Sequence, residues 1–393
     1  MAVITAVETT GSRKTSWHFF DRAARLVFGR AAPRSGGGLG VYVAHPKFQF
    51  GPLSIVTAEA LRVGSFGHGA LAAGIVMGAM APLILWFVLD ATRLAHPSGP
   101  VAVPRTGHEE LRQVRGSTAG GLGLLPAVTG ALLLPLVWGY LSVYSLHLDD
   151  ALAITLAVAA MWGVAKRSEV VVGLGLGLAM AAKPWAAAFL PLVLALPPGR
   201  RVRAGVIAVG TCAALWSPFV LGATGTTAAL GHFTIKNAPD SALRAFGVHN
   251  PFTPNWDRAA QVVVGGAAGV WCARSGRWPA VLMAAAAVRL AIDPGTHRYY
   301  VAGIVAFVLV WEVISARWSL PAVTAATALA LLEPHDLHWR AAVSGDIRLF
   351  ACLVVLGLAL VVKGPTTRSG DTRRHEPRLL HGDTDIDREL VGR

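Results

Sequence analysis

The sequence is poor in charged residues, which make up 15% of its 393 residues, whereas hydrophobic residues make up 54% and the mean hydropathy is +0.53. Soluble domains carry about 25% charged residues, so the shortage excludes an ordinary soluble protein. The three cysteines all lie in apolar segments without the spacing of metal ligands, which argues against a disulfide framework and a cysteine metal site. A phosphate-binding glycine loop is also lacking, because GLGLGLAM at 173–180 lies inside an apolar run and indicates close helix packing.

Long apolar segments fill residues 68–363 and predict an all-α fold, a polytopic transmembrane helix bundle with about eleven crossings. We expect crossings near 69–90, 119–143, 151–165, 168–182, 185–198, 204–222, 259–273, 278–292, 299–316, 319–333 and 347–363. Several are shorter than the roughly 20 residues of a simple span. The pair 168–182 and 185–198 is therefore predicted to form a tight hairpin that crosses only in part.

The net charge of +13 comes from basic residues in the short loops between these segments. This pattern is the positive-inside signature of membrane proteins and makes nucleic-acid binding a poor explanation. The loops predicted to be cytoplasmic hold Arg93, Arg105, Arg112 and Arg115, then Lys166 and Arg167, then Arg200, Arg201 and Arg203, and finally Arg274 and Arg277. The intervening loops should then lie outside the cell, together with most of the residues that could carry chemistry.

The two ends of the chain are predicted to lie outside the bundle. Residues 1–67 form an outer N-terminal region with an amphipathic helix at 17–29, and residues 364–393 form a disordered cytoplasmic tail. An outer location for the basic N-terminal region requires a preceding transmembrane helix, which this sequence lacks. The alternative is a cytoplasmic N-terminal region, and we favour the missing helix.

Two adjacent acids, Asp149 and Asp150, follow His147 at the junction of two apolar segments. Ionisable groups at membrane depth are costly, so a carboxylate pair there calls for a function. One of the two is expected to cap the helix that begins at Ala151. The other is a candidate catalytic acid or base.

Further polar residues fall in the predicted outer loops. Lys183 is either a lipid anchor or a ligand for a substrate phosphate. The loop 232–258 contains a predicted helix cap at Asp240 and Ser241, which places Arg244 on a first turn.

The segment DPGTHRYY at 293–300 combines a predicted turn at Asp293 with two possible donors to an anion, His297 and Arg298. Glu312, near the inner end of its crossing, is expected to be a structural or an interfacial charge.

Four stretches together resemble a known family: LHLDDALAITLA, AAKPWAAAFLPL, PDSALRAFG with PNWDRAAQ, and RLAIDPGTHRYYVAGI. They are similar to bacterial GT-C-fold glycosyltransferases, above all to the actinobacterial polyprenol-phosphate-mannose-dependent alpha-mannosyltransferases (glycosyltransferase family 87), over most of 17–316. The resemblance implies a multi-pass enzyme of the cell membrane with an extracytoplasmic active face. It also implies a polyprenyl-phosphate-linked sugar donor, a glycan or glycolipid acceptor and contact with membrane lipids. We expect no nucleic-acid partner and no cofactor, and no residue of the sequence is assigned as a metal ligand.

In such an inverting transfer a carboxylate deprotonates the acceptor hydroxyl while polyprenyl phosphate leaves. The candidate catalytic residues are Asp149, Asp150 and Asp21, the last because relatives place an acid just before the aromatic cluster at 17–20, where this chain has Ser16. The candidate substrate-binding residues, several of them cations for the leaving phosphate, are His147, Lys183, Arg244, Asp293, His297 and Arg298. Two alternatives remain, a transporter or flippase of lipid-linked sugars and a catalytically inactive membrane relative.

Overall fold

The computed structural model describes residues 16–29, 36–62, 64–96, 124–231, 234–315, 320–336 and 339–362. Over these residues the chain is helical and contains no strand beyond one isolated antiparallel bridge between Lys236 and Phe252. The all-α prediction is therefore confirmed for the described part, while the predicted disordered tail at 364–393 lies outside it. The helices are α2 Trp17–Phe28, η2 Gly38–Gly40, α3 Val41–Ala44, α4 Pro52–Leu61, α5 Phe66–Ala95, α8 Leu124–Gly139, η3 Tyr140–Tyr144, α9 Leu148–Ala165, α10 Glu169–Ala182, η4 Pro184–Ala195, α11 Pro198–Gly222, α12 Thr226–Gly231, α13 Ala242–Ala245, α14 Asp257–Arg274, η5 Trp278–Ala280, α15 Val281–Ile292, α16 Arg298–Ser315, α17 Ala322–Asp336 and α18 Ala341–Val361.

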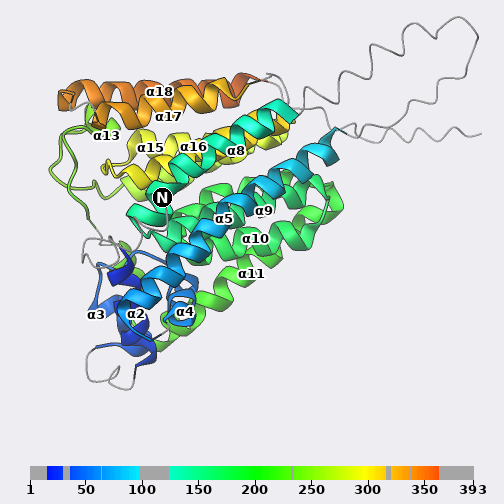
Figure 1. The fold of residues 1–393 in the computed structure, drawn as a ribbon. Helices are drawn as coiled ribbons and strands as arrows, with labels where there is room; N and C mark the ends of the chain where they lie inside the picture. The colour runs from blue at the N-terminus through cyan, green and yellow to red at the C-terminus, as the bar shows by residue number, and fades with distance from the viewer. Residues whose placement is uncertain are drawn as a thin grey trace, which may run out of the picture.

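The longer helices are roughly aligned and stack in layers (Figure 1). α17 and α18 form one layer, α8, α15 and α16 the next, and α5, α9, α10 and α11 the layers beyond, with direct packing between neighbours. The short helices α2, α3 and α4 gather at one end of this stack. The bundle thus has an end at which several short elements and helix termini meet.

Five of the described helices are long and apolar enough to cross a membrane, namely α5, α9, α11, α16 and α18. Six further apolar helices are shorter than a simple span. The protein is accordingly a multi-pass membrane protein by the length and composition of its helices. The predicted crossing at 185–198 takes a different form, a 3₁₀ helix, η4, with Pro191 in its interior. Proline has no N–H to donate, so a regular α-helix is disfavoured there.

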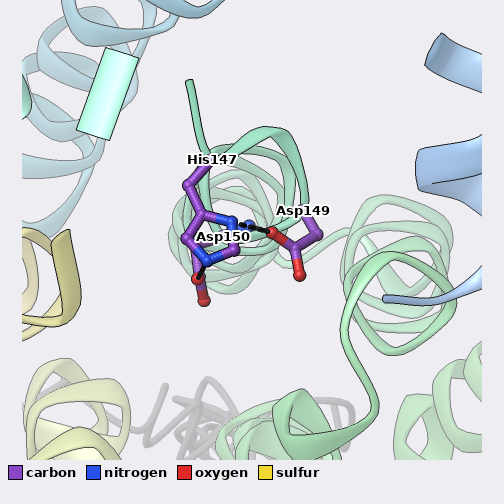
Figure 2. A group of neighbouring side chains, drawn as sticks. All are labelled: His147, Asp149 and Asp150. Carbon is purple, nitrogen blue, oxygen red and sulfur yellow. Dashed lines mark hydrogen bonds and ion pairs between the residues drawn. The ribbon is translucent and has the colours of Figure 1, made fainter. Parts of the chain in front are cut away.

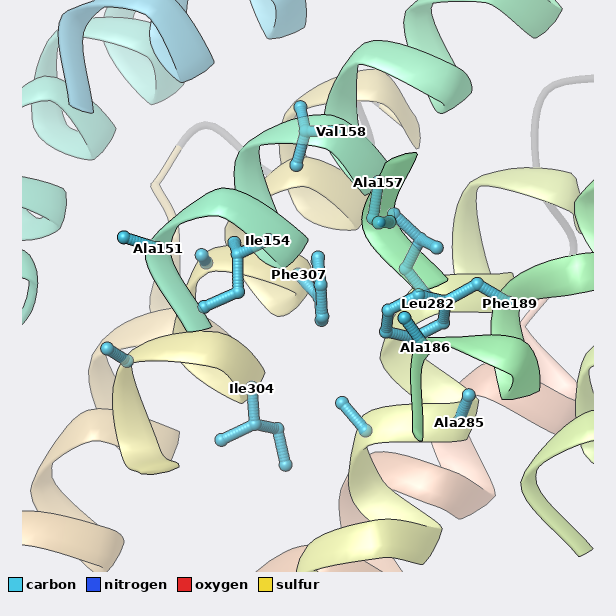
Figure 3. Packing of buried hydrophobic residues seen from close by; sticks show 14 of the residues in the cluster. Ala151, Ile154, Ala157, Val158, Ala186, Phe189, Leu282, Ala285, Ile304 and Phe307 are labelled. Atoms are coloured by element: carbon cyan, nitrogen blue, oxygen red, sulfur yellow. The ribbon is translucent and has the colours of Figure 1, made fainter. Parts of the chain in front are cut away.

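The centre of the bundle is packed by side chains from α9, η4, α15 and α16 (Figure 3). Ile154, Phe189, Leu282 and Phe307 are all buried there, and the rings of Phe189 and Phe307 meet edge to face at 5.2 Å. Because lipid is as apolar as these side chains, tight packing rather than removal from water holds such helices together.

Glycines in α10 allow its neighbours to approach closely, as the GLGLGLAM motif predicted. A Cβ at Gly175 would lie 2.8 Å from the carbonyl oxygen of Leu156 on α9. A Cβ at Gly177 would lie 2.6 Å from that of Ala208 on α11. Both distances are too short for any larger residue, so α10 is wedged between two helix backbones.

The predicted amphipathic helix at 17–29 is present as α2, with Trp17 and Phe20 buried and Phe19 exposed. It packs on α4, which in turn reaches the end of α10. There the Gly51 N–H donates to the Ala182 carbonyl at 2.7 Å, and the Ser54 hydroxyl donates to the same oxygen at 3.2 Å. The N-terminal region therefore holds the residue that precedes Lys183.

Candidate functional site

The backbone before α9 takes an irregular path. A π-helical turn, η3, ends at Tyr144, and Leu146 has a φ of 46°, in the left-handed region that side-chain-bearing residues seldom adopt. Such irregular turns are frequent at functional sites. His147 is the N-cap residue of α9, and it follows directly on this turn.

The prediction that an aspartate caps a helix at Ala151 is wrong, because α9 begins at Leu148 and both aspartates lie in its first turn. The irregular turn places the helix start earlier than the apolar pattern indicated. Asp149 Oδ1 nevertheless accepts the N–H of Asp150 at 2.9 Å, which satisfies one free donor of the helix start. Negative charge at this end is also favoured by the helix dipole.

The aspartates form a buried cluster with His147 and Lys183. Figure 2 shows His147 Nδ1 facing Asp149 Oδ1, at 2.8 Å, and His147 Nε2 facing Asp150 Oδ2, at 3.6 Å. Lys183 Nζ lies 2.6 Å from Asp149 Oδ2 and 2.8 Å from Asp150 Oδ2. The aspartates are only 1% and 2% exposed, so these ion pairs are shielded from solvent and strong.

Asp149 and Asp150 differ in how many of their carboxylate oxygens have a hydrogen-bond or ion-pair partner. Both oxygens of Asp149 are engaged, one by His147 and the Asp150 N–H and the other by Lys183. Asp150 Oδ1 makes no hydrogen bond within the described residues. Its nearest cation is Arg289, whose Nη1 lies 3.8 Å away. Asp150 thus retains an open acceptor, and Asp149 does not.

Lys183 is a fixed cation in this setting. Burial alone lowers the pKa of a lysine, but Asp149 and Asp150 outweigh it, so the pKa of Lys183 lies above its ordinary value. Its charge is already balanced by two carboxylates. It is therefore less available for a substrate phosphate than the sequence suggested.

Arg289, which the sequence analysis did not single out, joins Asp150 to Asp293. Its Nε lies 3.8 Å from Asp293 Oδ2, and its guanidinium lies over the ring of Trp185, at 4.0 Å, and over that of Tyr300, at 4.8 Å. The signal that could have found it is an arginine within an apolar run, four residues before an aspartate at the end of the same helix.

Asp293 continues the polar chain toward α14. As predicted it makes a turn, in which Oδ1 accepts the Gly295 N–H at 2.8 Å. Arg258 Nη1 lies 3.7 Å from Asp293 Oδ2, and Arg258 also neighbours Asp257, which accepts a hydrogen bond from Gln261 at 2.9 Å. Burial, with Asp293 nearby, raises the pKa of Asp257 to about 7.

A cavity of about 510 Å³ adjoins the cluster. Its lining residues are Ser16, Phe19, Tyr144, Ser145, Thr296, His297, Arg298 and Tyr299. The Tyr299 ring stacks on His297 at 5.1 Å and meets the His147 ring edge to face at 3.9 Å. Tyr299 therefore connects the cavity lining to His147, whose ring contacts both aspartates.

His297 and Arg298, the two predicted ligands for an anion, both line this cavity but differ in charge. Desolvation by the packed rings and the proximity of His147 keep the pKa of His297 below its ordinary value, so the imidazole is neutral at neutral pH. Arg298 carries a permanent charge, and its guanidinium lies 5.5 Å from the Tyr140 ring centroid. Arg298 is therefore the stronger anion ligand of the two.

Two other predicted site residues, Asp21 and Arg244, pair with partners outside the cluster. Asp21 forms ion pairs with Arg25, at 3.0 Å, and Arg62, at 3.3 Å. Arg244 follows the Ser241 cap as predicted, but its side chain donates to the Asn237 carbonyl within its own loop at 3.4 Å. Within the described residues, the ion pairs and hydrogen bonds of both side chains are thus made with groups other than the carboxylate pair.

Glu312 has a structural role, one of the two alternatives that were expected. It is 4% exposed, and its carboxylate accepts the backbone N–H groups of Val323 and Thr324 together with the Thr324 hydroxyl. These donors belong to the first turn of α17, so Glu312 fastens that helix to α16.

His147, Asp149 and Asp150 also form one group of possible metal ligands, with ligand atoms within 4.8 Å of one another. Carboxylate and imidazole suit several divalent cations. The ammonium of Lys183 already lies against both aspartates in this place.

Comparisons with known proteins give no relative: no protein-family model, no curated protein and no solved structure matches this chain.

Proposed function

We propose that this protein is a membrane glycosyltransferase that moves a sugar, with mannose the first choice, from a polyprenyl-phosphate donor to a glycan or glycolipid acceptor on the outer face of the membrane. The observation that carries the proposal is the open acceptor of Asp150. Its Oδ1 is buried without a hydrogen bond within the described residues, beside cations and one ring contact away from the large cavity.

In this proposal Asp150 is the general base that takes the proton of the acceptor hydroxyl. The freed oxygen attacks the anomeric carbon, the bond from that carbon to the phosphate oxygen breaks, and polyprenyl phosphate leaves with the electron pair. Lys183 and Arg289 hold the carboxylate in place, and Asp149 orients His147 through the contact to Nδ1.

Arg298 is the proposed ligand of the departing phosphate, since a guanidinium matches the geometry of phosphate oxygens. Tyr299 and His297 line the cavity, and the Tyr299 ring lies against His147. In this proposal an acceptor that enters from the cavity displaces the Tyr299 ring from His147 to reach Asp150.

The test is transfer of label from radiolabelled polyprenyl-phosphate mannose, in membranes that contain the full chain. Asp150→Asn should lower the rate by about 100- to 10,000-fold, the usual contribution of a general base. Asp21→Asn is the matched control, because Asp21 is also a buried, ion-paired acid, and it should keep activity within a few-fold.

The opposite pattern, loss with Asp21→Asn and retention with Asp150→Asn, would make Asp21 the base. Label that crosses the bilayer without transfer would support the flippase alternative. A folded wild-type protein that is inert to every donor would support the inactive alternative.

A further inference from the structure

Lys183 stands where three potential metal ligands converge. Its ammonium lies 2.6 Å from Asp149 Oδ2 and 2.8 Å from Asp150 Oδ2, and the ring of His147 contacts both aspartates. A divalent ion binds carboxylate oxygens at about 2.0–2.2 Å. An ion on these two oxygens and the lysine ammonium would therefore compete for the same space.

The ligand set is otherwise suited to a cation. One nitrogen and two carboxylates lie within 4.8 Å of one another, as a three-residue site requires. Asp150, only 2% exposed, also keeps one oxygen without a hydrogen bond within the described residues. The cluster thus has an unused donor atom in addition to those that Lys183 occupies.

Lys183 balances the negative charge of Asp149 and Asp150. Two buried carboxylates with oxygens within 4.8 Å of each other repel, and leaving them without a counter-charge is far more costly than keeping the pair neutralised. Arg289 offers only a distant contact, 3.8 Å, to Asp150, and His147 carries a charge only when protonated. Lys183 is therefore the lysine or arginine cation that lies closest to both carboxylates, at 2.6 and 2.8 Å.

We infer that the ammonium of Lys183 occupies the position of a divalent cation. It thereby blocks a metal site formed by His147, Asp149 and Asp150. Removing the ammonium opens this site to ions such as Mn²⁺. The inference stands apart from the proposed function, because its readout is metal binding and stability rather than transfer.

The experiment uses the full chain, purified in detergent on an affinity tag without histidines, and measures Mn²⁺ binding by electron paramagnetic resonance of the free ion. Lys183→Met should bind one Mn²⁺ per chain, with an affinity about 100-fold or more above that of the wild type, since a unit charge in direct contact with the ligands has been removed. Lys166→Met is the matched control. Lys166 pairs with the single carboxylate of Asp90, so its loss creates no group of three ligands and should leave binding at the wild-type level.

Two further variants locate the site and guard against simple misfolding. Adding His147→Ala to Lys183→Met should abolish the new binding. Lys183→Met with Asp150→Asn removes one charge of each sign, so its melting temperature without metal should exceed that of Lys183→Met and should not respond to Mn²⁺.

Wild-type protein that binds Mn²⁺ at this cluster, with loss of binding in His147→Ala, would overturn the inference. So would a Lys183→Met protein that neither binds Mn²⁺ nor gains stability from it. A double variant no more stable than the single one would overturn it as well, even where the single variant is recovered only in small amounts.

Discussion

Two buried acidic sites in this bundle show how differently a carboxylate can be used. Glu312 accepts three donors from the start of α17, and all of them belong to that helix turn. The pair Asp149 and Asp150 lies instead among ionisable side chains, with one oxygen left open within the described residues. A buried acid whose oxygens are all used by neutral donors of one helix turn joins helices, whereas one with an open oxygen among cations is suited to chemistry.

Asp149 is intermediate in this comparison, because its oxygens are as fully engaged as those of Glu312. Asp149→Asn should therefore act mainly on stability, with a loss of about 3 kcal/mol, since it removes one partner of a buried ion pair. Capping alone would have made the exchange cheap, because Asn caps about as well as Asp. Thermal unfolding in detergent measures the loss, and a variant as stable as the wild type would show that the Lys183 contact contributes nothing.

Glu312→Gln should cost less, about 1–3 kcal/mol, because the amide oxygen can still accept some of the α17 donors. Transfer activity per folded molecule should stay unchanged, in contrast to Asp150→Asn. The unfolding temperature and the transfer assay on the same preparation test both statements. Loss of activity at full stability would place Glu312 among the functional acids and break the comparison.

The smallest effect concerns Asp257, whose pKa of about 7 lies above its value of 3.8 in an unfolded chain. The folded protein holds this proton more tightly, so the contribution to stability is complete below about pH 4 and is lost as the pH rises through 7. Asp257→Asn cannot titrate and should remove this part of the pH dependence. Between about pH 5 and 8, the melting temperature should fall less with rising pH for Asp257→Asn than for the wild type. Parallel melting curves for the two proteins would contradict the raised pKa of Asp257.

Local sequence signals predicted much of the fold. The apolar runs predicted the helices, the glycines of α10 predicted close packing, and Ser241 predicted the cap of α13, because each of these effects acts within a few residues. The role of Glu312 could be anticipated as structural or interfacial, although its partners Val323 and Thr324 could not.

The site was predicted less completely, since it depends on which helix ends meet. His147, Asp149 and Asp150 are neighbours in sequence and were found together, but the position of Lys183 between them follows from the packing of α10 against α9. Arg289 carried a local signal, its charge within an apolar run, but nothing local shows that Asp150 on another helix faces it. The start of α9 was misplaced because a left-handed residue, Leu146, gives no sequence signal of its own.

The contact of Gly51 with the end of α10 has a consequence for biogenesis. The Ala182 carbonyl is held by a segment that leaves the ribosome about 130 residues earlier, as the separation of 128 residues between Ser54 and Ala182 shows. A Cβ at position 51 would lie 2.0 Å from the Ala181 carbonyl oxygen, so only glycine lets the two segments meet. The contact that holds the residue before Lys183 can therefore form only once the end of α10 has been synthesised, 128 residues after Ser54.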